Sequence, residues 1–153
     1  MSLKQKVMEQ LKLAMKSKDK VALESIRAIK SELLLAETSG TGVEITEEQE
    51  LKILQKLVKQ RKDSAATYTE QGREDLAAPE LAQVAIIAKF LPEQLDESAV
   101  KEIIAKIVEQ TGASSMADMG KVMGMASKEL AGKADGKTIS NIVRAYLMGG
   151  NSD

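Results

Sequence analysis

The sequence lacks cysteine, histidine and tryptophan altogether, and only two tyrosines and one phenylalanine occur in its 153 residues. Without cysteine or histidine the chain has no thiolate nucleophile, no histidine-based catalytic triad, no disulfide and no zinc site built on those residues. No apolar run approaches the roughly 20 residues of a membrane-spanning helix, and the first residues, MSLKQKVMEQ, carry charges where a secretory signal peptide is apolar. These absences predict a protein that acts without metal, cofactor or membrane and resides in the cytoplasm.

An excess of charge of either sign is also absent, because 22 basic residues face 23 acidic ones and the net charge is -1. A nucleic-acid partner therefore has to be met by a local patch, since the whole surface cannot steer RNA. With 43% hydrophobic and 29% charged residues, the composition fits one ordinary folded domain or two small ones.

Apolar residues recur at helical spacing along the whole chain. In the N-terminal half we expect four helices: from Leu3 to about Ser17, from the cap Asp19 to the SGTG break at residues 39–42, from Glu47 to about Gln71, and from about Asp75 to Phe90. Ser2 with Gln5, and Thr46 with Gln49, form capping boxes that start two of these helices.

Within these helices the spacing also predicts which side chains are buried. The inward stripes are Leu3, Val7, Leu11 and Met15 in the first helix, and Leu23, Ile26, Ile29, Leu33 and Leu34 in the second. Gly72 occupies the position of a left-handed C-cap. Pro79 is expected within the first turn of the fourth helix, or to mark a later start, because a missing N–H does little harm there.

The phrase FLPEQLDES marks a boundary, since Pro92 stops one helix and Asp96 caps another. Three shorter helices are expected after it: one around Val100 to Val108 that ends at Gly112, one from the cap Ser115 through Met116, Met119, Met123, Ala126 and Leu130, and one from Ile139 to Leu147. The predicted fold is all-α, with an N-terminal helical-hairpin domain over 1–94, a C-terminal three-helix domain over 95–148 and a disordered tail at 149–153.

The segment GKADGKT resembles a phosphate-binding P-loop, but its spacing is one residue short, with Ala131 where the first glycine should be. A P-loop also requires a strand entering it, and nothing nearby alternates with period two. We therefore interpret the segment as a turn between two helices, with Gly132 past the C-cap and Asp135 or Thr138 as the next N-cap.

Five strings, FLPEQL, DMGKVMG, GKADGKTISNIVRAYL, QRKDSAATY and GREDLA, make the chain resemble the YqeY-like family from about Leu3 to Leu147. That family is similar to the tail of the B subunit of glutamyl- and aspartyl-tRNA amidotransferase. The resemblance implies a helical N-terminal domain, a three-helix C-terminal domain, and a module of translation that contacts tRNA, with an amidotransferase or tRNA synthetase complex as a further partner. The chain departs from the tail at Asp135-Gly136, where the relative tends to have Asn-Pro.

Gly120 and Gly124 lie four residues apart within a predicted helix, where each costs about 1 kcal/mol against alanine. One explanation is close packing of another helix, and the other is close approach of an RNA backbone. For RNA, the phosphate contacts are expected from five basic residues of the C-terminal half: Lys121, Lys128, Lys133, Lys137 and Arg144. A solvated charged face remains the alternative for these residues.

A possible second patch consists of Lys52, Lys56 and Lys59 on one side of the long third helix. Either this face is merely solvated beside Glu48 and Glu50, or an anionic partner offsets the repulsion. Because aromatic side chains are so few, structured RNA held by its phosphates is favoured over single strands read by base stacking.

Arg61 falls in the middle of an apolar stripe of the third helix, between Leu57 and Ala65. A buried charge needs a partner, so the pattern predicts a structural ion pair with Glu74, Asp75 or Glu80 that connects the third and fourth helices.

No spacing singles out a catalytic carboxylate, lysine or tyrosine, so no catalytic residue is assigned. The function that best fits the sequence is a non-catalytic tRNA-binding module associated with tRNA-dependent amidotransfer. The first alternative is a protein–protein adaptor, in which Met116, Met119, Met123 and Met125 form an adaptable surface. The second is an enzyme with carbon–nitrogen ligase activity in a complex.

Overall fold

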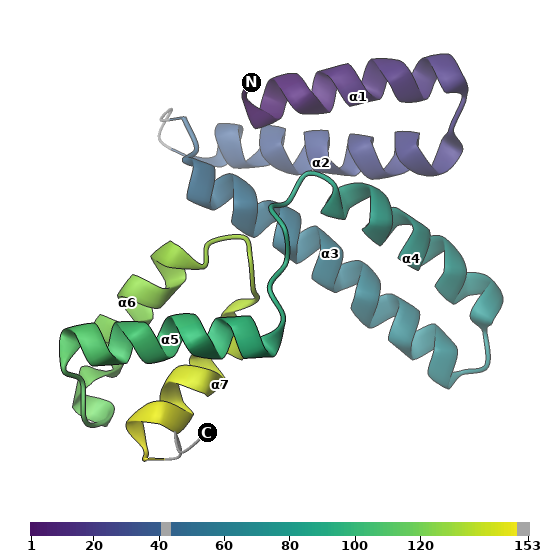
Figure 1. Cartoon of the computed structure of the whole chain (residues 1–153). Coiled ribbons are helices and arrows are strands. Elements are labelled where there is room, and N and C mark those ends of the chain that lie inside the picture. The colour runs from purple at the N-terminus through teal and green to yellow at the C-terminus, as the bar shows by residue number, and fades with distance from the viewer. Residues whose placement is uncertain (41–43, 150–153) are drawn as a thin grey trace. The chain divides into compact units, whose positions relative to one another are not determined.

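The computed structural model describes residues 1–40 and 44–149, and every regular element in these two ranges is a helix. The elements are α1 (Leu3–Ser17), α2 (Lys20–Ser39), α3 (Glu47–Glu70), α4 (Glu74–Ala88), α5 (Glu97–Thr111), the short 3-10 helix η1 (Met116–Asp118), α6 (Met119–Glu129) and α7 (Gly136–Leu147) (Figure 1). The predicted all-α class is confirmed. The tail predicted to be disordered lies, beyond Gly149, outside the described residues.

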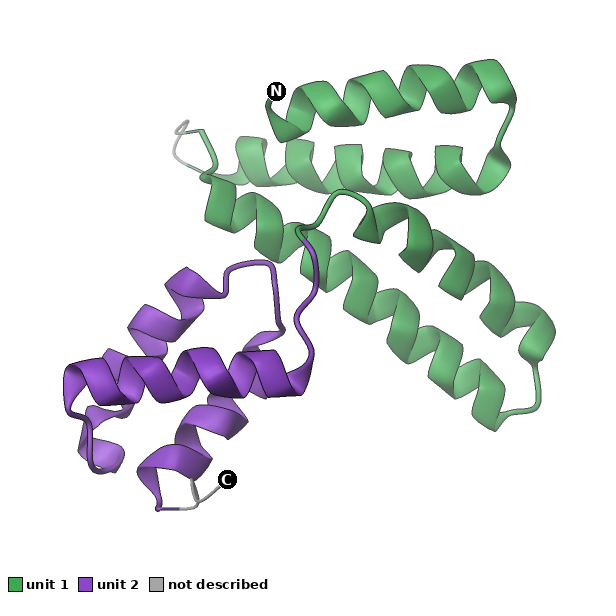
Figure 2. Ribbon diagram, viewed as in Figure 1, with its two compact units in different colours: residues 1–92 green, residues 93–153 purple. Residues whose placement is uncertain are grey.

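The chain divides into two compact units, unit 1 (Met1–Pro92) and unit 2 (Glu93–Asp153) (Figure 2). Each unit has its own hydrophobic core. Whether the two halves fold independently, with the border between residues 94 and 95, stays a prediction from the sequence.

Unit 1 consists of two helical hairpins, α1–α2 and α3–α4, and α2 packs against α1, α3 and α4 (Figure 1). Both predicted capping boxes are present, Ser2 with Gln5 and Thr46 with Gln49. The α3–α4 connection contains Gly72 with φ of 72°. This left-handed conformation favours glycine because no Cβ clashes there.

The core of unit 1 contains Ile29, Leu54 and Ile87, each fully inaccessible to solvent. Two residues that the spacing placed inside are exposed instead, Met15 at 57% and Leu34 at 58%. Ala14 is buried in the position expected for Met15. For Met15 the difference arises because a stripe at intervals of four drifts around a helix of about 3.6 residues per turn.

Pro79 lies farther into α4 than expected. The helix begins at Glu74, so the proline falls in its second turn. The first-turn position and the later helix start that the sequence offered are therefore both wrong. A proline there has no N–H to donate and its ring crowds the carbonyl four residues earlier. The hydrogen bonds from the Leu76 and Ala77 N–H groups to the Arg73 carbonyl oxygen set the earlier start.

Unit 2 is a bundle in which α5, α6 and α7 each pack against the other two (Figure 2). Its buried core draws on all three helices: Val100, Ile104 and Ile107 from α5, Val122 and Ala126 from α6 with the adjoining Leu130, and Ile139, Ile142, Val143 and Leu147 from α7. Asp96 caps α5, and Gly112 ends it with φ of 67°. Met116, which the spacing placed in this core, is exposed.

Lys18 is the only non-glycine residue with positive φ in the described ranges, at 56°. It ends α1 in the left-handed conformation and turns the chain toward the α2 cap, Asp19. Because a Cβ is disfavoured there by about 1–2 kcal/mol, we expect Lys18→Gly to raise the free energy of unfolding by about 0.5–1 kcal/mol. Urea denaturation measures this, with Lys18→Ala as the control that removes the charge and keeps the strain. A loss of stability in the glycine variant would contradict the strain argument.

Candidate nucleic-acid interface

Gly120 and Gly124 lie on an exposed face of α6. A Cβ atom added at either position would meet no atom within 4 Å among the described residues. Close helix packing, one of the two explanations for this pair, is therefore not seen within the described chain. The packed face of α6 is the opposite one, which buries Val122 and Ala126. The two glycines leave a strip of helix backbone open to solvent.

Two lysines flank this strip. At about 100° per residue, Lys121 and Lys128 lie within about 100° of Gly120 and Gly124 on the helix surface, and both lysines are exposed. Asp118 is an acid near Lys121. Its carboxylate accepts hydrogen bonds from the N–H groups of Ser114 and Ser115 at 3.0 and 3.4 Å. These bonds, with a smaller contribution from Lys121, hold the pKa of Asp118 below its usual range.

The loop between α6 and α7 is a helix-to-helix turn, as the sequence predicts. Gly132 has φ of 75°, and the Asp135 carboxylate accepts from the Thr138 N–H at 2.6 Å as the N-cap of α7. No strand enters this loop in the described part of unit 2. The P-loop interpretation is thereby excluded, because its amides would lack the element that aims them.

The loop is also held from outside. The Gln94 side-chain amide donates to the Gly132 carbonyl oxygen at 2.6 Å, and the Leu95 N–H donates to the Lys133 carbonyl oxygen at 2.9 Å. Gln94 was not singled out from the sequence as a positioning residue, and its place in the FLPEQL string was the available signal. These two bonds fix the backbone that carries Lys133.

Lys137, Asn141 and Arg144 share the exposed face of α7. The opposite face buries Ile139, Ile142 and Val143. The five basic residues Lys121, Lys128, Lys133, Lys137 and Arg144 are all exposed, and none forms an ion pair with an acid in the described ranges. Two groups of candidate residues are thus assembled, one on α6 and one on α7, with Lys133 in the turn between them.

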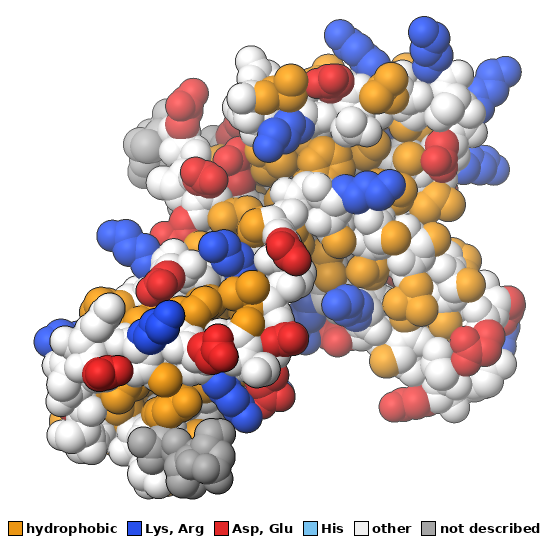
Figure 3. All heavy atoms as spheres, in the orientation of Figure 1, with side chains coloured by type: hydrophobic (Ala, Val, Ile, Leu, Met, Phe, Trp, Pro, Cys, Tyr) orange, Lys and Arg blue, Asp and Glu red, His pale blue; other side chains and the backbone are white. Residues whose placement is uncertain are grey.

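The second lysine patch, on α3, is different because its charges are largely paired. Lys52 lies 3.7 Å from Glu48, and Lys59 lies 2.7 Å from Asp63. Within the described residues only Lys56 of this patch has no ion-pair partner. This arrangement fits a solvated face, which is the first of the two explanations that the sequence offers for the patch. Mixed charges are not confined to α3, because Figure 3 also shows acidic and basic side chains together over the face of α5 in unit 2.

Arg61 does connect α3 with α4, but the partner is not an acid. Its Nε donates to the Gln83 amide oxygen at 2.7 Å, and its Nη1 donates to the Leu57 carbonyl oxygen at 3.1 Å. Gln83 donates in turn to Glu24 of α2 at 3.2 Å. The predicted pair with Glu74, Asp75 or Glu80 is corrected accordingly, and Asp75 pairs with Arg73 at 3.0 Å. A half-buried guanidinium is satisfied here by neutral oxygens, which the sequence argument did not consider.

The methionines proposed for an adaptor surface fall into two groups. Met116 and Met125 are exposed, whereas Met119 and Met123 pack against the core of unit 2.

The described helices include none long and apolar enough to cross a membrane. Within the same ranges no cluster of three or more acidic side chains is arranged to hold a metal ion.

Residues 4–147 match the family described as Yqey-like protein. The chain belongs to this family. The predicted resemblance, which rested on the strings around GKADGKT and FLPEQL, is confirmed. The match covers residues of both compact units.

Several relatives share the name "Altered inheritance of mitochondria protein 41, mitochondrial". The protein of that name from Pyrenophora tritici-repentis is 32% identical over 143 residues, which are 90% of this chain and 76% of the relative. The one from Clavispora lusitaniae is 39% identical over 97 residues, which are 63% of this chain and 55% of the relative. A subunit of the glutamyl-tRNA(Gln) amidotransferase of Thermococcus gammatolerans is 36% identical over 59 residues, 39% of this chain and 9% of that subunit.

The expected cytoplasmic location is contradicted by these names, because four relatives are designated mitochondrial. The expectation rested on the absence of cysteine and of an apolar leader. The absence of cysteine and of an apolar leader does not identify the compartment.

The Arg61–Gln83 hydrogen bond predicts a measurable coupling between α3 and α4. In a double-mutant cycle of Arg61→Met and Gln83→Leu, monitored by urea denaturation, we expect a coupling free energy of about 1 kcal/mol, because a charged donor is paired with a half-buried amide. The matched cycle with Glu80→Gln should give a coupling of less than about 0.5 kcal/mol. A larger coupling to Glu80 than to Gln83 would restore the ion pair expected from the sequence.

Proposed function

We propose that this chain is a non-catalytic tRNA-binding module that acts with a tRNA-dependent amidotransferase, and that unit 2 makes the RNA contact. The observation that carries the proposal is the uncovered glycine strip of α6, with unpaired lysines beside it. Similarity to an amidotransferase subunit named for glutamyl-tRNA(Gln) supports tRNA as the partner.

The physical argument starts from the cost of the glycines. A helix with glycine at two positions forgoes up to about 1 kcal/mol of stability at each, and nothing in the described chain packs into the space gained. A partner that approaches the helix backbone closely would use that space. The sugar–phosphate backbone of RNA fits this role, because Lys121 and Lys128 flank the strip with charges that attract phosphates.

Contacts to phosphate suit this surface better than stacking of bases. The three aromatic side chains, Tyr68, Phe90 and Tyr146, are all half-buried, so none offers the free ring face that single-strand binders use. Structured RNA held by its backbone is therefore the proposed ligand.

A catalytic role as a carbon–nitrogen ligase has less support. The match to the amidotransferase subunit covers 9% of that protein, so whatever chemistry the complete subunit takes part in need not reside in the matched segment. We assign this chain to binding and positioning.

A protein–protein adaptor is the second candidate, because Met116 and Met125 remain exposed at the surface of unit 2. Flexible thioether side chains adapt to varied apolar partners. RNA is preferred because exposed methionine explains neither the open glycine strip nor the unpaired lysines.

The glycine strip gives a test in which stability and binding change in opposite directions. Neither glycine has positive φ, so alanine fits the backbone at both positions. We expect Gly120→Ala with Gly124→Ala to raise the free energy of unfolding by about 2 kcal/mol and to weaken binding of tRNA transcripts at least tenfold, because two methyl groups hold the RNA away. Ala117→Ser on η1 is the control for a small change beside the strip. Unchanged affinity in the stabilised variant would exclude the strip from the interface.

The lysines give a second test, the salt dependence of tRNA binding. Each neutralised phosphate contributes about -0.9 to the slope of log affinity against log salt for a duplex, so Lys133→Gln with Lys137→Gln should flatten the slope by nearly two. The loss should be similar for tRNA(Gln) and for an unrelated tRNA, because phosphate contacts do not read sequence. The control variant replaces Lys52, Lys56 and Lys59, and its slope should change less. A larger effect of the α3 variant would move the RNA surface to unit 1.

A further inference from the structure

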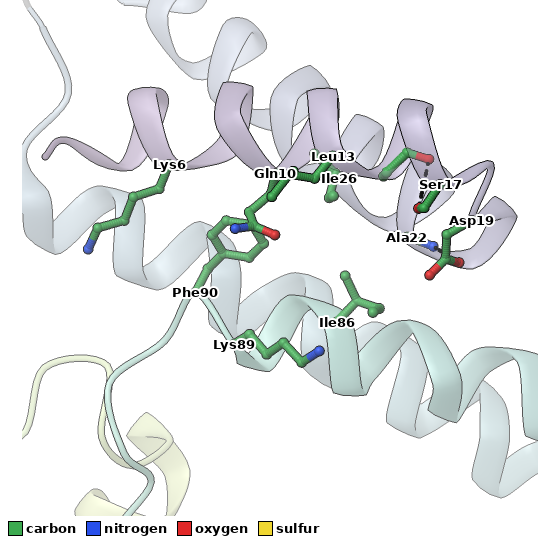
Figure 4. Close-up of a pocket in the computed structure, with 11 residues that line it drawn as sticks. Lys6, Gln10, Leu13, Ser17, Asp19, Ala22, Ile26, Ile86, Lys89 and Phe90 are labelled. Atoms are coloured by element: carbon green, nitrogen blue, oxygen red, sulfur yellow. Dashed lines mark hydrogen bonds between the residues drawn. The ribbon is translucent and has the colours of Figure 1, made fainter.

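A pocket of about 500 Å³ lies in unit 1 between α1, α2 and the C-terminal end of α4. In Figure 4, Lys6, Gln10 and Leu13 extend from α1, Ile86, Lys89 and Phe90 come from the α4 side, and Asp19 stands at the start of α2. The size falls within the roughly 300–1,000 Å³ that small-molecule sites occupy. All lining residues belong to residues 1–92, so the pocket shares no residue with the proposed RNA surface.

The inner surface of the pocket is apolar. Ala14, Ala22 and Ile26 are buried at its floor, and Ile86 and Phe90 are half-buried in its wall. Leu13 is 53% exposed beside them. A ligand with an apolar body gains free energy there because it removes this surface from water.

The polar groups of the pocket divide into those already engaged and those that are available. The Asp19 carboxylate accepts from the Ala22 N–H at 3.0 Å, and the Ser17 hydroxyl donates to the Ala14 carbonyl oxygen at 3.3 Å. Lys6 and Lys89 form no ion pair in the described ranges, and Gln10 has no hydrogen bond from its side chain there. Figure 4 shows the Lys6 side chain directed away from Lys89, on the other side of Phe90, and Lys6 also lines a second hollow together with Glu47 and Glu50. The Lys89 ammonium and the Gln10 amide thus remain for one ligand.

The surroundings add to the positive charge. Helix α1 carries Lys6, Lys12 and Lys16 with one acid, Glu9, while its remaining lysine, Lys4, pairs with Glu37 at 2.8 Å. Figure 3 shows basic side chains projecting along this helix at the top of the view. Lys18 and Lys20 flank Asp19 in sequence, which offsets its negative charge. The field at the pocket therefore favours an anion.

We propose that this pocket binds a small anionic amphiphile, a carboxylate or phosphate ester on an aliphatic or aromatic body. The body lies against Ile86 and Phe90, and the anionic group lies at Lys89 and Gln10. A carboxylate and a phosphate share the two features that the pocket recognises, a negative head and an apolar body.

Octanoate is the probe for the test, titrated into the full-length chain below micelle formation and followed by ¹H–¹⁵N NMR and calorimetry. Shift changes should map to α1, the start of α2 and residues 86–90, and leave 93–149 unchanged. Butyrate should bind at least tenfold more weakly, because four methylene groups of about 0.8 kcal/mol each are missing. 1-Octanol should bind several-fold more weakly, and octylammonium more weakly still.

The head-group contact is tested by Lys89→Gln. A lysine at a partly exposed site should account for about a threefold change, so this variant should bind octanoate roughly threefold more weakly. Lys12→Gln is the matched control, an exposed lysine of α1 that does not line the pocket. 1-Octanol binding should be unchanged in both variants, which checks that the pocket keeps its shape.

Three outcomes would overturn the proposal: no binding of octanoate up to millimolar concentration, binding of octylammonium as tight as that of octanoate, or shift changes centred outside the pocket. Phosphate and carboxylate ligands are separated by repeating the titration with octyl phosphate. Tighter binding of either anion than of 1-octanol supports the site. The ratio of the dissociation constants of octanoate and octyl phosphate identifies the preferred head group.

Discussion

The architecture of unit 1 depends on one constraint, the burial of the inner face of α2. This helix packs against α1, α3 and α4, and it buries Ala22, Ser25, Ile26, Ile29 and Leu33 in doing so. Burying one large aliphatic side chain contributes about 1.5–3 kcal/mol, and the chain has no disulfide to supplement this term. Ser25 can join the apolar face because its hydroxyl donates to the Val21 carbonyl oxygen at 2.7 Å. The pocket follows from the same arrangement, since α1 and α4 both contact α2 and leave a hollow beside it.

Local rules predicted most of the fold, because caps and left-handed turns depend on residues close in sequence. The Ser2 and Thr46 capping boxes, the Asp19 and Asp96 caps and the turns at Gly72 and Gly112 all appear where the sequence places them. Burial was predicted less well. Leu34 is exposed and Ser25 is buried because the packing partners of α2 determine which face turns inward, and those partners come from distant segments.

The candidate RNA surface shows the same division between local and distant information. Helical spacing alone places Gly120, Gly124 and Lys128 on one face, and the structure adds that this face is open. The partner of Arg61 could not be derived in this way, because Gln83 is 22 positions away and no pattern distinguishes it from nearby acids. The pocket was missed for a similar reason, since its lining residues come from α1, the start of α2 and the end of α4, which are distant in sequence and meet only by packing on α2.

Some residues that are locally unfavourable have a role within the folded chain, and others do not. The left-handed Lys18 has a structural role, because it turns the chain between α1 and the Asp19 cap of α2. Gly132 likewise adopts a conformation that a Cβ would strain, and its carbonyl oxygen is held by Gln94. Gly120 and Gly124 differ from both, since their backbone is ordinary helix and no described atom comes near enough to require glycine. Folding alone would favour alanine at these two positions, which is why we propose that their bare backbone serves a molecule outside the chain.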